Sequence, residues 1–170
     1  MTNPRIFRRR RALEVGMDAV LDTARRAAER GHHAAAERLC RQVLALEPEY
    51  ASALHLLARV ADAAGSTFDA MVILQRALQI EPDHAGWQHE YGVLCRHMGR
   101  YADAATAMRT AIRLRPYRAS SMVELGMALV AMGGWEDAEY WAARALQIEP
   151  GNTEARALLE HVFEAGVDAA

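Results

Sequence analysis

The sequence predicts an all-α fold, an α-α superhelix built from stacked pairs of antiparallel helices. The first observation is a repeat: four of the five prolines lie 34 residues apart, and a fixed period of this length is typical of stacked-repeat proteins. The second observation is that glycines and small residues align in the same register. The aligned prolines are Pro48, Pro82, Pro116 and Pro150, the glycines are Gly31, Gly65, Gly99 and Gly133, and the small columns are Ala36, Ala70, Ala104 and Ala138, then Ala24, Ala58, Gly92 and Gly126.

These columns have steric explanations. A glycine after an apolar-periodic run can adopt the left-handed conformation that ends a helix. A small residue where two helices cross lets their backbones approach closely. Large apolar residues precede each proline, as Leu44 and Leu46 precede Pro48. Each repeat is therefore predicted to form a helix, a glycine turn, a second helix and a proline stop.

The N-terminal segment, residues 1–16, lies outside the repeat register and is basic. It carries Arg5, Arg8, Arg9, Arg10 and Arg11 against one acid, Glu14. We expect a solvated arm or a short extra helix, with binding to nucleic acid or to an anionic membrane as the weaker alternative. No apolar stretch of the kind found in secretory signals follows the arginines, since residues 12–26 are interrupted by charges.

The repeats cover residues 17–50, 51–84, 85–118 and 119–152, and residues 153–166 are predicted to form a last, capping helix. A stack needs such a cap because its terminal repeat would otherwise expose an apolar face. We expect residues 17–170 to form a single domain. The chain resembles the tetratricopeptide repeat (TPR) family over 136 of its 170 residues. In the third repeat the resemblance is carried by Gly99, Tyr101, Ala104, Ala111 and Pro116.

The first repeat departs most from the pattern. Thr23 stands where the later repeats have Leu57, Tyr91 and Leu125, and His33 stands where the last two have Tyr101 and Trp135. Its packing is therefore the least predictable of the four.

Composition limits the chemistry of the chain. The sequence is 52% hydrophobic with 6% aromatic residues, and all 20 basic residues are arginine, which excludes a Schiff-base lysine or a phosphate-loop lysine. Cys40 and Cys95 fall in core columns, so we expect buried apolar side chains in a reducing compartment rather than a redox or metal role. We accordingly predict a cytoplasmic location.

Sequence motifs of catalysis are absent. There is no glycine-rich phosphate loop, no His-Glu-x-x-His, no Cys-x-x-Cys and no Gly-x-Ser-x-Gly. We therefore expect neither an enzyme nor a cofactor. A metal site at His55, His89 and His97 is a weak alternative, because their spacing does not match ligands within one helix.

Charge is distributed unevenly along the repeats. The third repeat has six arginines against two acids, whereas the fourth has five acids against one arginine. This pattern is explained equally well by attraction between neighbouring repeats or by a role in binding.

The resemblance to TPR proteins implies a concave groove lined by the first helices of successive repeats. The candidate groove residues are Arg25, His55, Arg59, Asp62, His89, Val93, Arg96, His97, Val123, Met127 and Val130. Arg59 and Arg96 could grip carboxylates, and the apolar residues of the fourth repeat could anchor an apolar side chain. The family's carboxylate clamp is not expected, because Leu21 and Arg25 stand where it needs lysine and asparagine.

The sequence thus favours a non-catalytic protein-interaction adaptor or scaffold. Its groove would bind a peptide or a helix with acidic and apolar segments. Two alternatives stay open: a chaperone-like protein of the type III secretion class, and a non-catalytic TPR module of a larger glycosyltransferase or sulfotransferase. Nucleic acid is an improbable partner, and self-association is a further option.

Overall fold

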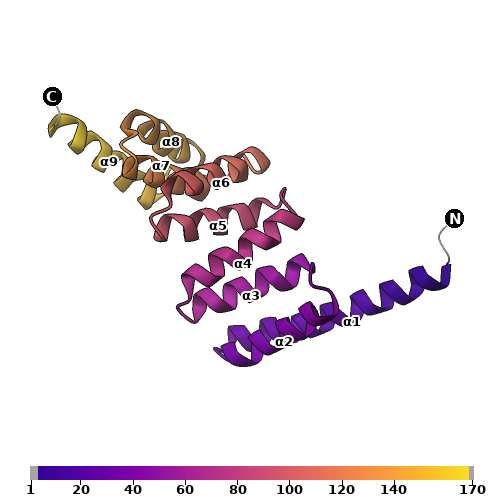
Figure 1. Cartoon of the computed structure of the whole chain (residues 1–170). Coiled ribbons are helices and arrows are strands. Elements are labelled where there is room, and N and C mark those ends of the chain that lie inside the picture. The colour runs from indigo at the N-terminus through magenta and orange to yellow at the C-terminus, as the bar shows by residue number, and fades with distance from the viewer. Residues whose placement is uncertain (1–3, 169–170) are drawn as a thin grey trace. The chain divides into compact units, whose positions relative to one another are not determined.

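The computed structural model describes the backbone of residues 4–168 and the side chains of residues 13–165 (Figure 1). Within this part of the chain there are nine helices and no strand. The helices are α1 (Pro4–Glu29), α2 (His33–Leu46), α3 (Ala51–Ala63), α4 (Thr67–Ile80), α5 (Ala85–His97), α6 (Tyr101–Leu114), α7 (Ala119–Ala131), α8 (Trp135–Ile148) and α9 (Thr153–Asp168). The all-α prediction is confirmed, and each predicted repeat supplies two of these helices.

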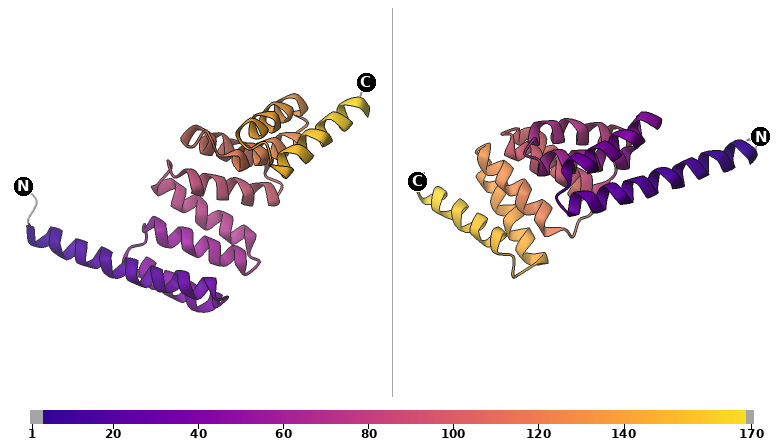
Figure 2. Two further views of the ribbon diagram at one scale, coloured as in Figure 1. Left: turned by 180° about the vertical axis from the view of Figure 1, so that it is seen from behind. Right: turned by 90° about the horizontal axis from the view of Figure 1, so that it is seen from below.

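The chain divides into two compact units. The first, residues 1–81, holds α1 to α4, and the second, residues 82–170, holds α5 to α9. Within each unit the two helices of a repeat pack on each other, as α3 and α4 do side by side in the views of Figures 1 and 2. That residues 17–170 behave as a single domain stays a prediction.

The turns within the repeats follow the glycine column. Gly31, Gly65, Gly99 and Gly133 have φ values of 76°, 85°, 71° and 80°, a region that other residues rarely adopt. At the first turn, the Gly31 N–H donates to Ala28 O and the His32 N–H donates to Ala27 O, both at 2.9 Å. These bonds satisfy the last carbonyls of α1 in the way a Schellman motif does. The predicted role of the glycine column is confirmed.

Helix α1 is longer than the other first helices, with 26 residues against 13 in α3. The additional turns come from the basic N-terminal segment, whose backbone from Pro4 onward is continuous with the first repeat (Figure 1). The segment is thus neither a separate helix nor an irregular arm over residues 4–16. The side chains of its arginines lie outside the described residues.

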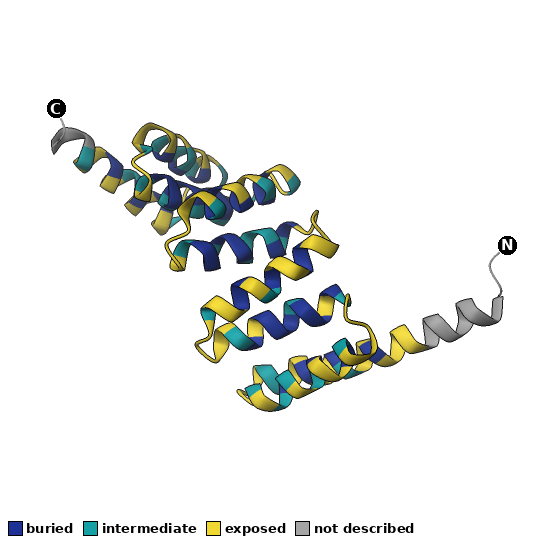
Figure 3. Ribbon diagram, in the orientation of Figure 1, coloured by how far each residue is buried: buried dark blue, intermediate teal, exposed yellow. Residues whose placement is uncertain are grey.

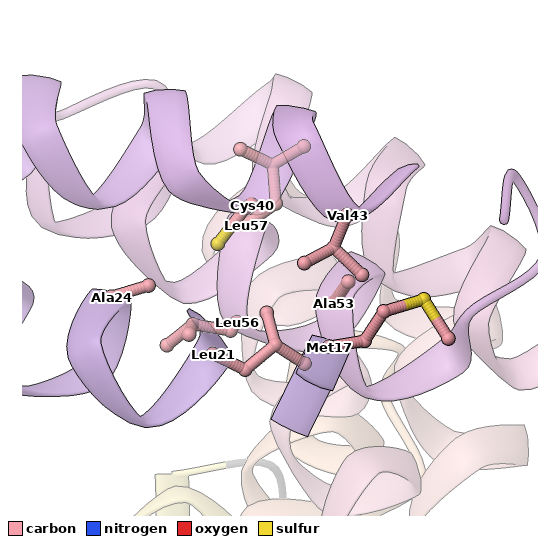
Figure 4. Packing of buried hydrophobic residues seen from close by; sticks show 8 residues of the cluster. All are labelled: Met17, Leu21, Ala24, Cys40, Val43, Ala53, Leu56 and Leu57. Atoms are coloured by element: carbon pink, nitrogen blue, oxygen red, sulfur yellow. The ribbon is translucent and has the colours of Figure 1, made fainter. Parts of the chain in front are cut away.

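The core of the first unit forms where the aligned small residues let the helices pack closely. Its buried residues are Met17, Leu21, Ala24, Cys40, Val43, Ala53, Leu56 and Leu57 (Figure 4). Cys40 is fully buried, and burial raises the pKa of its thiol to about 11. The thiol therefore stays protonated and behaves as a small apolar side chain. Cys95 is equally buried in the second unit, so both cysteines lie in the core as predicted.

Two glycines in the second unit have no room for a side chain. A Cβ placed on Gly92 of α5 would lie 2.7 Å from Met108 Cε and 3.3 Å from Ala104 O, both on α6. A Cβ on Gly126 of α7 would lie 2.6 Å from Leu158 Cδ2 of α9. Helix α9 contacts α7 and α8 and buries Ala155, Leu158 and Val162, leaving its other face exposed (Figure 3).

Candidate functional site

The first helices of each unit contact one another. Helix α1 contacts α3, α5 contacts α7 and α7 contacts α9, whereas no pair of second helices within a unit is in comparable contact among the described residues. The first helices therefore lie closer together than the second helices. We call the side they form in each unit its inner face, and the predicted groove residues belong to these helices.

The inner face of the first unit contains a cavity of about 130 Å³. It is lined by Arg25, Ala28, Glu29, His33, Leu56, Arg59, Val60 and Ala63. Two of the predicted groove residues, Arg25 and Arg59, thus line one cavity together with apolar side chains. Arg25 pairs with Asp22 at 2.6 Å, while the exposed Arg59 forms no ion pair with a described residue.

Two other predicted residues of this unit lie on α3. His55 is half-buried, and Asp62 is exposed, with its carboxylate accepting a hydrogen bond of 3.0 Å from Thr67 Oγ1. Neither lines the cavity between the two arginines. The sequence register alone groups all four residues, but the structure brings together only the two arginines.

In the second unit, an ion pair joins two neighbouring repeats across the inner face. Arg96 of α5 donates from Nε to Glu124 Oε2 of α7 at 2.6 Å, and both side chains are mostly buried, with exposures of 25% and 17%. Its NH2 group also lies 3.3 Å from His97 Nε2. Arg96 is therefore paired within the protein. Attraction between the basic third repeat and the acidic fourth repeat accounts for this arginine and for Glu124.

A second polar contact joins the same helices. His89 Nδ1 of α5 lies 3.0 Å from Ser121 Oγ of α7, and Ser121 is fully buried. Sequence reasoning missed both Ser121 and Glu124. Ser121 could have been noticed as a serine at the repeat position that holds Ala53 and Ala155, since a polar group in a core column needs a partner.

This contact predicts a pH dependence of stability. Burial, followed by the positive charge of Arg118, lowers the pKa of His89 below its ordinary value of 6.5. The unfolded chain therefore binds a proton before the folded chain does, so this histidine should reduce the free energy of unfolding as the pH falls through about 6.5 and below. Urea titrations between pH 7.5 and 5 should show a smaller loss of stability for His89→Gln than for the parent. An unchanged pH dependence in that variant would contradict the assignment.

The apolar part of the predicted groove is only partly accessible. Met127 and Val130 of α7 and Val93 of α5 are half-buried on the inner face, but Val123 is completely buried. Helix α7 is enclosed by α5, α6, α8 and α9, which explains why it is apolar nearly all round. The prediction that Val123 faces a ligand is therefore corrected: its side chain belongs to the core.

Within the described chain, no three side chains of His, Cys, Asp or Glu are grouped closely enough to hold a metal ion, and His55 and His89 lie in different units. Of the helices that the structure describes, none combines the length and the apolar character needed to cross a bilayer.

Comparisons with known proteins agree with the repeat fold described above. Two family models, both described as tetratricopeptide repeat, match residues 27–89 and 96–153. A search of curated protein sequences gave no significant match. A crystal structure of MamA superposes with a TM-score of 0.80 at 21% identity, covering 84% of each chain.

Two further solved structures carry information on ligands in their names. YrrB, described as a TPR protein with an unusual peptide-binding site, superposes with a TM-score of 0.81 at 16% identity over 86% of this chain and 76% of its own. The first TPR of Spaghetti (RPAP3), bound to the HSP90 peptide SRMEEVD, has a TM-score of 0.66 at 20% identity over 69% and 93%. These likenesses confirm the predicted fold class, a solenoid of antiparallel helix pairs.

Proposed function

Because the chain belongs to the tetratricopeptide repeat family, we propose that it is a non-catalytic adaptor that binds a peptide or a helix of a partner protein. Proteins of this family are generally non-catalytic scaffolds, and the fold is that of a protein-interaction module. In this proposal the inner faces bind the partner, the chain itself catalyses nothing, and it acts in the cytoplasm.

The observation that carries the proposal is the pair of arginines in the first unit. Arg25 and Arg59 line one cavity together with the apolar Leu56, Val60 and Ala63. Guanidinium groups bind carboxylates in a forked geometry, and the apolar part of the lining favours a neighbouring aliphatic side chain. A peptide with both acidic and apolar residues fits this arrangement.

The second unit supports the apolar part of the same proposal. Met127 and Val130 are half-buried on its inner face, so a ligand side chain could displace water from them. The peptide bound to RPAP3, SRMEEVD, combines acidic residues with methionine and valine, which makes this class of ligand reasonable for a protein of the same fold. The chaperone and enzyme-module alternatives stay hypotheses.

We expect short synthetic peptides that combine glutamates with methionine or valine to bind, and charge-reversed lysine versions not to bind. Arg25→Ala with Arg59→Ala should slow association roughly tenfold and flatten its salt dependence, since exposed charges mainly steer encounter. Met127→Glu should instead raise the dissociation rate, because it disturbs an apolar contact. Surface plasmon resonance over a range of salt concentrations measures both rates.

The matched control removes two arginines from second helices, Arg38→Ala with Arg76→Ala. Both residues are exposed on α2 and α4, so the net charge changes equally while the inner face stays intact. Equal association rates for the two double variants would refute an inner-face role for Arg25 and Arg59. A preference for the lysine peptides would refute the acidic ligand.

A further inference from the structure

The first repeat lacks an aromatic ring that the last two repeats have. His33, the first residue of α2, occupies the repeat position of Tyr101 and Trp135. The packing role of this position is visible at Trp135, whose ring lies with its centroid 5.9 Å from that of His161 on α9, the next first helix. In the first repeat, the helix that takes the place of α9 is α3, and the side chain facing it is a smaller histidine.

A cavity of about 380 Å³ lies at this position. It is lined by His33, Glu37, Arg41, Leu57, Val60, Ala61, Ala64, Ser66, Asp69, Val72 and Ile73. These residues come from α2, from the C-terminal half of α3, from the turn after it and from α4. The cavity adjoins the one between Arg25 and Arg59 and shares His33 and Val60 with it. Its size is within the range of small-ligand sites.

The walls combine apolar surface with a few polar groups. Leu57, Val60 and Ile73 supply buried or half-buried apolar surface. Glu37 and Arg41 neutralise each other, with Oε1 and NH2 2.7 Å apart. The polar groups left for a ligand are the imidazole of His33, the hydroxyl of Ser66 and the carboxylate of Asp69.

His33 also carries an unsatisfied atom. Its Nδ1 is buried and has no hydrogen-bond partner in the described structure. A buried polar atom without a partner is unfavourable. Because this atom has no surface accessible from the cavity, a guest donor would satisfy it only after the His33 ring turned, and the acceptor that a guest reaches directly is the carboxylate of Asp69.

We propose that this cavity binds one tryptophan or tyrosine side chain of a partner protein. The guest ring takes the place of the ring that the repeat position supplies elsewhere in the chain. Tryptophan and tyrosine combine a large apolar surface with one hydrogen-bond donor, which matches the apolar walls and the carboxylate of Asp69. The cavity shares His33 and Val60 with the inner-face cavity, so its occupancy is read from residues that line this cavity alone.

The test uses N-acetyl-tryptophanamide as the probe and N-acetyl-leucinamide as its aliphatic control, with the full chain observed by ¹H–¹⁵N correlation spectroscopy. The tryptophan probe should shift the amide signals of residues that line this cavity alone, such as Ala61, Asp69 and Ile73, in a saturable way. The leucine probe should shift them much less. His33→Trp fills the cavity with the chain's own ring, so it should abolish these shifts and raise the temperature of thermal unfolding.

A matched variant, His32→Ala, removes the neighbouring histidine, which is exposed and does not line the cavity, and should leave the shifts unchanged. The proposal is overturned if both probes shift the same amides equally, or if His33→Trp folds and still responds to the tryptophan probe. It is also overturned if the cavity signals shift with protein concentration alone, because a second copy of the chain would then be the occupant.

Discussion

Replacing Ala104 by leucine is expected to lower the temperature of thermal unfolding by roughly 2 to 12 °C. Ala104 is 1% exposed on α6, and its carbonyl lies 3.3 Å from where a Cβ of Gly92 would be. There is no room for a larger side chain at this crossing, and overpacking of a core typically costs about 1 to 3 kcal/mol. For a chain of this length, each kcal/mol corresponds to roughly 2 to 4 °C.

The control for this prediction is Ala102→Leu. Ala102 lies on the same helix but is exposed, so the added side chain enters solvent and the helix propensity changes equally. Differential scanning calorimetry on the two variants separates the steric effect from the propensity effect. Similar unfolding temperatures for the two variants would mean that α5 and α6 can separate without loss of stability.

The ion pair between Arg96 and Glu124 should show a coupling energy of about 1 to 2 kcal/mol in a double-mutant cycle. The reason is its partial burial: removing either partner leaves a charge that water reaches poorly, whereas removing both does not. The variants are Arg96→Ala, Glu124→Ala and their combination. Urea unfolding of the parent and the three variants gives the four free energies that the cycle needs.

The exposed pair of Arg25 and Asp22 is the internal reference. Its side chains are 51% and 59% exposed, and pairs of this kind contribute about 0.3 to 0.5 kcal/mol. The same cycle on Arg25 and Asp22 should therefore give a smaller coupling energy. Equal values for the two pairs would argue that burial does not strengthen the contact between α5 and α7.

The fold could be predicted from the sequence because its determinants are local and repeated. A turn that requires a positive φ selects glycine, so Gly31 and its three equivalents mark the turns directly. A close helix crossing selects the smallest residues, so Gly92 and Ala104 mark where helices meet. Each such requirement recurs every 34 residues, and this repetition makes the repeat boundaries recognisable in the sequence.

The candidate site was less predictable. The repeat register correctly placed Arg25 and Arg59 on first helices, and the structure adds that they share a cavity. The repeat register could not indicate that Arg96 pairs with Glu124, since the two residues are 28 positions apart and equivalent pairs are absent from the other repeats. The partner of a long side chain depends on which helices pack beside its own helix, and the sequence of one repeat does not contain this information.

The sequence by itself determined the helices, their glycine turns and the small residues at their crossings, because these depend on backbone geometry within one repeat. Only the tertiary structure decided which side chains remain available to a ligand. Val123 is buried because α7 is surrounded by four helices, and the cavity beside His33 lies between helices of two repeats. Accessibility depends on what neighbouring helices cover, and residues remote in the sequence supply that cover.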